Sequence, residues 1–338
     1  MHTGIAWDSI GYQVAIVDNH GKSVSPTRRF HANEFDQMID FVCNNSQEVV
    51  VDGTNGLLDS RISELNVTVY RTNQSDPSNL PLLGSLSAET LARSATQDRC
   101  LLTKLGLGLG THAGRDKELA EGFATSMAAV ATQPGPARFL RHGPRQKKRI
   151  ALTFDDGPFP PYTGQILDIL EHYSVPATFF CVGLNSIAHP DILIRIREQG
   201  SEIGNHTWSH PLLMDLSSRQ IAEQLRHTNK AVSSITDGTH PTLFRPTYGI
   251  LPKGPYKWLS RLNMTTVFWD VNSMDWATPG VDEITQSVLG RVQHGSIVLM
   301  HDGGGVRSQT VAALPTIIET LLAREYQLVR VDNLIRDE

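Results

Sequence analysis

The chain has 338 residues, 40% of them hydrophobic and 19% charged, a composition typical of an ordinary globular protein with room for about two domains. Its formal net charge of −5 provides no general attraction to nucleic acid or to an anionic membrane. The 3 cysteines lie far apart and form no CxxC pair, so neither a disulfide framework nor a cysteine-rich metal site is predicted.

The N-terminal sequence alternates polar and apolar residues and has no basic stretch followed by an apolar one. This pattern is typical of a strand and not of a secretory signal. No run of about 18 consecutive apolar residues occurs, which is the length needed to span a bilayer. We therefore expect a cytoplasmic protein with no membrane partner.

Short apolar runs in residues 1–131 predict a small α/β domain with a helical extension. Residues 34–44 have apolar side chains at helical spacing, and residues 86–131 are rich in Ala and Leu and are predicted to be helical. The predicted strands are Gly4–Trp7, Val14–Val17, Val49–Gly53 and Val67–Tyr70.

Residues 132–148 are rich in Pro, Gly and basic side chains and lack apolar periodicity, which predicts a domain linker or a surface crossover. Two interpretations of its basic cluster remain. The cluster is either simply solvated or contacts an acidic partner or nucleic acid.

Residues 149–338 alternate between strand-like and helix-like segments. Repeated βα units with short loops predict a parallel sheet, either open or closed into a barrel. The predicted strands are Ile150–Phe154, Ala177–Val182, Glu202–Asn205, Thr242–Phe244, Thr265–Trp269, Ile297–Met300 and Gln327–Val331.

A polar cluster follows most of these apolar runs, and such clusters meet at the carboxyl ends of parallel strands. The clusters are Asp155-Asp156, Asn205 to His210, Arg245 to Tyr248, Asp270 with Asp275-Trp276, and His301-Asp302. Unrelated turns would not be expected to bring so many ionisable side chains to one rim.

The segment Thr153-Phe154-Asp155-Asp156-Gly157 has two interpretations. Asp and Gly are common in turns, so the segment alone is compatible with a plain turn. Adjacent carboxylates repel each other unless a positive charge lies beside them, which favours a cation site.

His206 and His210 are four residues apart, so a helical turn would place both imidazoles on one side to share a metal ion. Asp156 completes a three-ligand site with a position open for water. Asp155 is then free to accept a proton from that water. Such a site suits hydrolysis of an amide or an ester.

A second group must protonate the departing nitrogen during amide hydrolysis. His301 is the candidate because histidine titrates near neutral pH. Taken alone, it is equally compatible with an ordinary loop histidine.

These motifs resemble the polysaccharide deacetylases of the NodB-homology type, carbohydrate esterase family 4, over residues 149–334. Five family motifs appear in order along the chain. They are Thr153 to Gly157, His206 to His210, Arg245 to Tyr248, Asp270 to Trp276, and Leu299 to His301. Thr247 stands where a second proline is more usual in the third motif.

The resemblance implies a role for each residue of these motifs. Asp155 is the base, and Asp156, His206 and His210 are the metal ligands. Arg245 orients Asp155, the Tyr248 backbone N–H stabilises the oxyanion, and Asp275 orients the acid His301. The pocket for the acetyl group is implied to be lined by Pro246, Trp276 and Leu299.

The resemblance also implies a distorted (β/α) barrel of seven or eight strands and one divalent ion, usually zinc and sometimes cobalt or nickel. The implied reaction removes N-acetyl groups from an acetylated amino sugar, such as a chitin oligomer or peptidoglycan. Because no export signal is predicted, an amidohydrolase acting on a soluble small molecule is the first alternative.

Residues 1–131 resemble a ribonuclease H-like domain of the transposase type, through Ile5 to Ser9, Val14 to Asp18 and Val51 to Gly56. The resemblance implies that Asp8 and Asp52 bind magnesium, although it prefers Glu at the second position. The competing interpretation is a domain that serves packing or partner binding. A nucleic-acid-associated protein with a regulatory deacetylase-like domain is therefore the second alternative.

Overall fold

A computed structural model describes residues 1–61, 65, 67–72, 80–97, 101–105, 116–132, 138–252 and 257–335. The chain divides into two compact units. The first contains Met1–Ala131, Ser209–Gln224 and Ile250–Gly254, and the second contains Thr132–Trp208, Leu225–Gly249 and Pro255–Glu338. Within the described residues, no helix has both the length and the apolar character needed to cross a bilayer.

The first unit is built on a six-stranded sheet with the order β3-β2-β1-β4-β5-β6. Strand β1 pairs antiparallel with β2 and parallel with β4. The strands are β1 (His2–Trp7), β2 (Gly11–Val17), β3 (Arg28–His31), β4 (Glu48–Val51), β5 (Thr68–Thr72) and β6 (Leu102–Lys104), and the helices are α1 (Phe35–Asn45), α2 (Gly56–Arg61), α3 (Ala88–Ser94) and α4 (Asp116–Thr132).

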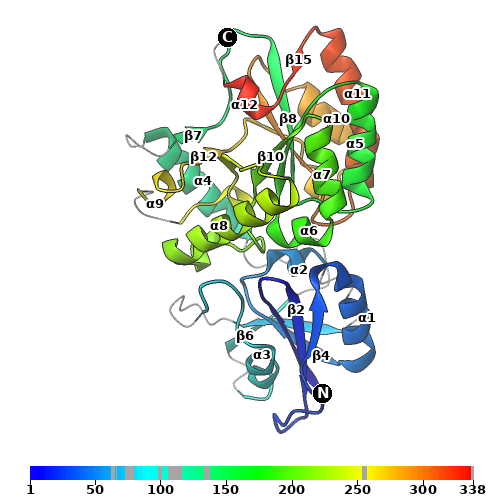
Figure 1. The fold of residues 1–338 in the computed structure, drawn as a ribbon, viewed down its shortest axis with the longest axis vertical. Helices are drawn as coiled ribbons and strands as arrows, with labels where there is room; N and C mark the ends of the chain where they lie inside the picture. The colour runs from blue at the N-terminus through cyan, green and yellow to red at the C-terminus, as the bar shows by residue number, and fades with distance from the viewer. Residues whose placement is uncertain are drawn as a thin grey trace. The chain divides into compact units, whose positions relative to one another are not determined.

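Alternation of side chains along β1 and β2 gives this sheet two apolar faces. Ala6 and Ala15 pack with Leu91 of α3 on one face. Tyr12 points to the other face, where its ring makes an edge contact with Phe35 of α1. Figure 1 shows α1 and α3 on either side of the sheet. Strand β6 lies inside the 86–131 region that the sequence predicted to be helical, so that prediction is wrong for this segment.

The second unit is built on a nine-stranded sheet, in which the path β13-β14-β8-β9-β10-β11-β12-β7 is extended by β15 pairing with β8. The helices are α5 (Tyr162–His172), α6 (Gly183–Ala188), α7 (Pro190–Glu198), α8 (Ser218–Ile235), α9 (Lys257–Ser260), α10 (Val281–Leu289), α11 (Ser308–Ala323) and α12 (Val331–Leu334). The strands are β7 (Arg138–Leu140), β8 (Arg149–Asp155), β9 (Thr178–Cys181), β10 (Glu202–Asn205), β11 (Leu243–Phe244), β12 (Thr265–Val267), β13 (Val271–Asn272), β14 (Ile297–His301) and β15 (Gln327–Leu328).

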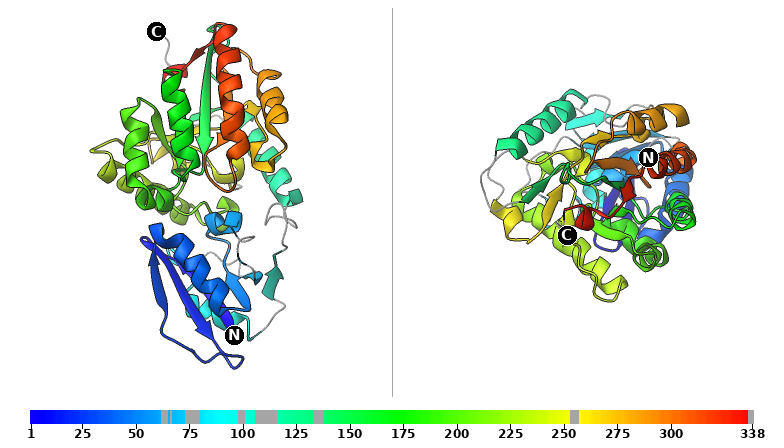
Figure 2. Two further views of the ribbon diagram at one scale, coloured as in Figure 1. Left: turned by 90° about the vertical axis from the view of Figure 1, so that its right-hand side faces the viewer. Right: turned by 90° about the horizontal axis from the view of Figure 1, so that it is seen from above.

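All strand pairs of this sheet are parallel, and the sheet is curled, as the view from above in Figure 2 shows. Its two ends approach each other where Gly143, after β7, donates a backbone hydrogen bond to Gly295, before β14, at 2.7 Å. The sheet has nine strands, whereas the resemblance implies seven or eight. The apolar runs of the sequence did not predict the short strands β7 and β13. Strand β7 falls in the predicted linker, of which residues 133–137 lie outside the described part.

Side chains on the two faces of the curled sheet have different partners. Leu152 and Phe154 of β8 and Met300 of β14 belong to the core formed with α5, α7, α10 and α11, which pack on the outside of the sheet (Figure 1). Ala151 and Ile297 point to the inner face, where they pack with Phe180 and Val267. The same alternation turns the polar ends of β8 and β14 inward.

We predict that Glu202→Gln changes the pH dependence of stability. Oε2 of Glu202 accepts hydrogen bonds from the Asp332 backbone N–H (3.1 Å) and the Thr178 hydroxyl (3.3 Å). Burial, and then the nearby Asp332 carboxylate, raise the pKa of Glu202 from 4.5 to about 7. Because the pKa of Glu202 is higher in the folded chain, folding favours its protonated form. The stability that this form contributes is complete below pH 4.5 and is lost as pH rises through about 7.

Glutamine keeps the acceptor oxygen but stays neutral, so the Tm of the variant relative to wild type should increase from about pH 5 to about pH 8. Calorimetric scans at the two pH values measure this difference. The exposed Glu198→Gln is the control and should show no such increase. An equal Tm difference for Glu202→Gln at both pH values would contradict the prediction.

Candidate active site

The inner face of the curled sheet carries the side chains at the heart of the site. Thr153 and Asp155 of β8 are in register with Leu299 and His301 of β14. Because alternate residues share a face, all four point to the inside of the curled sheet. The sequence separates these two pairs by about 145 residues, and only the parallel pairing of β8 with β14 brings them together.

Arg245, directly after β11, is fully buried beneath this row. Its Nη1 donates to Asp155 Oδ1 and to the Thr153 hydroxyl, both at 2.7 Å. Its Nε and Nη2 donate to the backbone carbonyls of Val267 and Phe268. Burial lowers the pKa of Arg245, while the charge of Asp155 and the hydrogen bond to it oppose that effect. One oxygen of Asp155 is thereby fixed, which leaves Oδ2 to face the rest of the site.

Asp156 ends the strand in a tight turn, with φ of 80°. Its backbone carbonyl accepts a hydrogen bond from the Asn185 side chain at 2.7 Å. The strand ends at Asp155 and the chain bends at Asp156, as the turn interpretation predicts, and the cation-site interpretation stays a prediction. The turn aims the two adjacent carboxylates differently and keeps both at the same end of the strand.

His206 and His210 lie in an extended loop after β10, so the predicted helical turn is wrong. Thr207 and His210 have positive φ values of 71° and 56°. The Thr207 N–H is held by the side chain of Asn205, and the Thr207 carbonyl accepts from the N–H of Gly183 at the start of α6. These bonds to a neighbouring element replace the bonds that a helix would make.

The side chains of Asp156, His206 and His210 form the group of metal-ligand type found among the described residues. Each offers one ligand atom, and these atoms lie within 4.8 Å of one another. His206 Nδ1 bonds to the Arg245 carbonyl at 2.8 Å, so this nitrogen carries the proton and Nε2 has its lone pair toward Asp156 Oδ1, 3.4 Å away. A carbonyl that orients a histidine in this way is typical of metal sites, so the residues fit a divalent ion.

His301 is paired with Asp275, which lies in a short 3₁₀ turn (Asp275–Ala277). Asp275 Oδ1 and His301 Nδ1 are 2.7 Å apart, and Oδ2 accepts the His301 backbone N–H at 2.8 Å. Burial lowers the pKa of His301, but the charge of Asp275 and its hydrogen bond outweigh burial and raise the pKa above its usual value. For Asp275, burial is likewise outweighed by His301, so its pKa is lowered.

The remaining predicted site residues are Tyr248 and the pocket residues Pro246, Trp276 and Leu299. Tyr248 has a left-handed backbone, with φ of 59°, in the turn after Arg245, and Pro246 is buried. Leu299 is buried on the inner face of β14, whereas Trp276 is 53% exposed beside Asp275. Trp276 is therefore open to a molecule approaching the site.

Sequence reasoning missed several residues that hold the site in place. Asp302 is buried and accepts the Gly157 N–H (3.0 Å) and the Thr163 hydroxyl (2.7 Å), and so secures the turn after Asp156. Burial raises the pKa of Asp302 to about 7, and Asp156 adds to the effect of burial. The signal available in the sequence was its position directly after His301. Arg307 and Thr310 had no such signal, because they lie at the beginning of a helix after the last motif.

Asp8 and Asp52 hold local structure in the first unit. Asp8 Oδ1 accepts the N–H groups of Ile10 and Gly11 in the turn between β1 and β2. Asp52 is buried after β4, and its oxygens accept from Thr54 and from the Leu86 N–H. Among the described residues, the two carboxylates do not belong to a group of metal-ligand type.

The second half of this chain is similar to known polysaccharide deacetylases. The profile of the polysaccharide deacetylase family matches residues 142–267. A peptidoglycan-N-acetylglucosamine deacetylase of Bacillus cereus is 38% identical over 195 residues, which cover 57% of this chain and 91% of that protein. A chitooligosaccharide deacetylase of Sinorhizobium fredii is 35% identical over 201 residues, covering 56% of this chain and 94% of that protein.

A solved structure agrees with these matches. A peptidoglycan N-acetylglucosamine deacetylase in complex with 4-(naphthalen-1-yl)-N-hydroxybenzamide has a TM-score of 0.56 and 35% identity, over 59% of this chain and 94% of that chain. A curled parallel sheet with an Asp/His/His group at its carboxyl edge defines a class of metal-dependent hydrolases that act on amide bonds. Within that class, the chain belongs to the polysaccharide deacetylase family of the NodB-homology type, carbohydrate esterase family 4.

We predict that Gly304→Ala weakens metal binding. Gly304 has φ of +68° and packs on Asp156, so that an added Cβ would overlap Oδ2 and lie 3.1 Å from Cγ. The methyl group would push a predicted ligand out of place. Zinc titration by calorimetry should show an affinity about 10-fold lower or more, in line with other changes beside metal ligands.

Gly200→Ala is the matched control for this variant. Gly200 has φ of +77° and nothing within 4 Å of an added Cβ, so it introduces similar backbone strain without the contact. Both variants should lose about 1–2 kcal/mol of stability from the left-handed backbone. Equal zinc affinities in the two variants would show that the contact with Asp156 does not matter.

Proposed function

We propose that this protein removes N-acetyl groups from carbohydrates that contain N-acetylglucosamine, of the chitin-oligomer or peptidoglycan type, with zinc as the divalent ion. The observation that carries the proposal is the convergence of Asp155, the Asp156/His206/His210 group and the Asp275–His301 pair on one rim of the curled sheet. The names of the relatives from Bacillus cereus and Sinorhizobium fredii support this substrate class.

Asp156, His206 and His210 are the residues that would hold the ion. Their chemistry, one carboxylate oxygen and two imidazole nitrogens, suits zinc and leaves a coordination position open. When bound, the ion would acidify a water molecule and polarise the amide carbonyl. Cobalt and nickel accept the same ligands, so the choice of zinc rests on its general preference for such sites.

Asp155 acts in this proposal as the general base. Arg245 fixes Oδ1 at 2.7 Å, and Oδ2 lies 3.8 Å from His206 Nε2, on the side of the metal ligands. The fixed carboxylate presents Oδ2 as the atom that accepts a proton from the attacking water. Tyr248, whose left-handed backbone lies in the turn after Arg245, contributes its backbone N–H to the oxygen of the tetrahedral species.

His301 acts as the general acid that protonates the departing amine. Its Nδ1 is engaged by Asp275, an acceptor that keeps the proton on that nitrogen and leaves Nε2 to face the reaction. Asp275 also raises the pKa of His301 above its usual value, which favours the imidazolium form that donates the proton. Base and acid thus stand on the paired strands β8 and β14, at the registered positions 155 and 301.

For the first unit we propose a ribonuclease H-like fold that serves packing or partner binding. The proposal is supported by a mixed sheet in which an antiparallel β1-β2-β3 ribbon is joined to the parallel strands β4 and β5. The hydrogen bonds that tie Asp8 and Asp52 into turns favour the packing role over magnesium binding.

Acetate release from a panel of N-acetylated compounds tests the deacetylase proposal. The panel contains chitooligosaccharides, muropeptides, free N-acetylglucosamine and its nucleotide conjugates, each with zinc-loaded and chelated protein. Chelator-sensitive release from the oligomers supports the proposal. Acetate release from a nucleotide conjugate alone would favour a small-molecule amidohydrolase. No acetate release from any compound of the panel would overturn both the deacetylase proposal and this alternative.

We predict that Asp155→Asn and Asp156→Asn separate the base from the ligand. Asp155→Asn should lower kcat by about 100- to 10,000-fold while zinc stays bound, because a proton acceptor is lost and no ligand is. Asp156→Asn should instead lower zinc affinity in a calorimetric titration. Loss of zinc from Asp155→Asn would contradict the assigned roles.

A further inference from the structure

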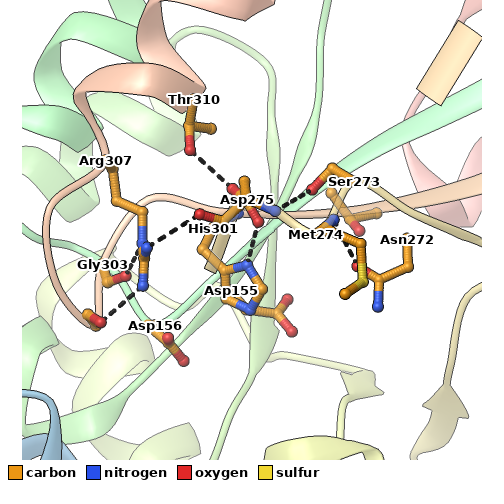
Figure 3. A network of polar contacts seen from close by, with 12 residues as sticks. Asp155, Asp156, Asn272, Ser273, Met274, Asp275, His301, Gly303, Arg307 and Thr310 are labelled. Carbon is orange, nitrogen blue, oxygen red and sulfur yellow. Dashed lines mark hydrogen bonds and ion pairs between the residues drawn. The ribbon is translucent and has the colours of Figure 1, made fainter. Parts of the chain in front are cut away.

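A residue in the first turn of α11, Thr310, bonds to Asp275, the partner of the proposed acid His301. Asp275 and Thr310 are each 1% exposed, and the Thr310 hydroxyl donates to Asp275 Oδ2 at 2.8 Å. The same oxygen accepts the His301 N–H, while Oδ1 bonds to His301 Nδ1. Figure 3 shows these groups in a row, with the imidazole between Asp275 and Asp155.

Two donors on Oδ2 fix the rotation of the Asp275 carboxylate. A carboxylate on a short side chain turns easily about its last bond, since that torsion is broad and about two-fold. The His301 N–H and the Thr310 hydroxyl approach the same oxygen from two elements, β14 and α11. Asp275 Oδ1 is thereby aimed at His301 Nδ1, and this bond fixes the plane of the imidazole.

Arg307, which precedes α11, secures the base of this arrangement. Its Nε and Nη2 donate to the carbonyls of Gly303 and Gly304 at 2.7 Å each, and its Nη1 is 3.5 Å from the Asp275 carbonyl. The start of α11 is therefore anchored both to the glycine segment that packs on Asp156 and to the turn that carries Asp275. Thr310, one helical turn further on, has a fixed position from which to donate.

We propose that Thr310 is a positioning residue of the deacetylation reaction, acting through Asp275 to hold the imidazole of His301 in place for proton donation. This inference rests on the proposed function, because it assigns His301 to the acid step. The Thr310 hydroxyl donates to Asp275, which is not a predicted metal ligand, so its effect should fall on the chemical step and not on metal binding.

The test compares Thr310→Val with Thr310→Ser in the zinc-loaded full chain. Valine keeps the shape of threonine but cannot donate, whereas serine keeps the hydroxyl. Thr310→Val should lower kcat about tenfold, the effect of one lost hydrogen bond to a charged group, with KM and zinc content unchanged. Thr310→Ser should recover most of the lost rate.

Thr236→Val is the matched control. Thr236 is as buried as Thr310, and its hydroxyl donates to the Val232 carbonyl at 2.7 Å, away from the acid pair. Thr236→Val should lower Tm by about as much as Thr310→Val does, and it should leave kcat unchanged. The proposal is overturned if Thr310→Val retains the wild-type kcat, if Thr310→Ser is no faster than Thr310→Val, or if Thr236→Val slows the reaction equally.

A measurement without turnover separates this proposal from the proposed function. The Nδ1 proton of His301, bonded to Asp275, can be followed by its exchange with solvent in nuclear magnetic resonance spectra. Exchange should be faster in Thr310→Val than in wild type and in Thr310→Ser. If wild-type protein releases no acetate, the proposed function is wrong, whatever the exchange rates are. If the Nδ1 proton exchanges equally fast in all three proteins, the positioning role of Thr310 is wrong.

Discussion

The buried ion pair between Arg245 and Asp155 is the interaction on which the rest of the site depends. A guanidinium removed from water is tolerated only when its donors are satisfied and its charge is paired. Here Asp155 and Thr153 lie on β8, and the carbonyls of Val267 and Phe268 lie at the end of β12. The ring of Phe180, 4.1 Å from the guanidinium carbon, covers one face. One side chain thus joins the inner surfaces of several strands.

Arg245 also connects the proposed base to the predicted metal ligands. The carbonyl of Arg245 bonds to His206 Nδ1, while its side chain bonds to Asp155. A displacement of Arg245 would therefore disturb both the proton acceptor and a predicted ligand. The acid pair is supported separately, by β14 and by the start of α11. The site therefore has two separately supported halves, which meet because β8 and β14 are neighbours.

Glycine and left-handed residues give the loops around this site their shape. Asp156, Thr207, His210 and Tyr248 all have positive φ, a backbone that non-glycine residues adopt only when their surroundings hold them there. In this protein the Asn205 side chain accepts the Thr207 N–H, the Gly183 N–H of α6 donates to the Thr207 carbonyl, and Gly304 packs closely on Asp156. These left-handed residues lie among the three predicted ligands and beside Tyr248, whose N–H is the proposed oxyanion donor.

Much of this protein was determined by its sequence alone. Apolar runs that alternate with helical patterns specify a parallel sheet, and the polar residues that end those runs must gather at its carboxyl edge. The period of two along β8 and β14 places Asp155 and His301 on one face.

Other features of the site depend on contacts in the tertiary structure that no local sequence pattern indicates. The loop that carries His206 and His210 is held by bonds from α6 and by the carbonyl of Arg245, not by helical bonds. Strands β7 and β13 are too short to have a signal of their own. Arg307 and Thr310 matter only because the fold brings the start of α11 against Asp275. Such contacts join residues far apart in the chain, so no local period or spacing records them.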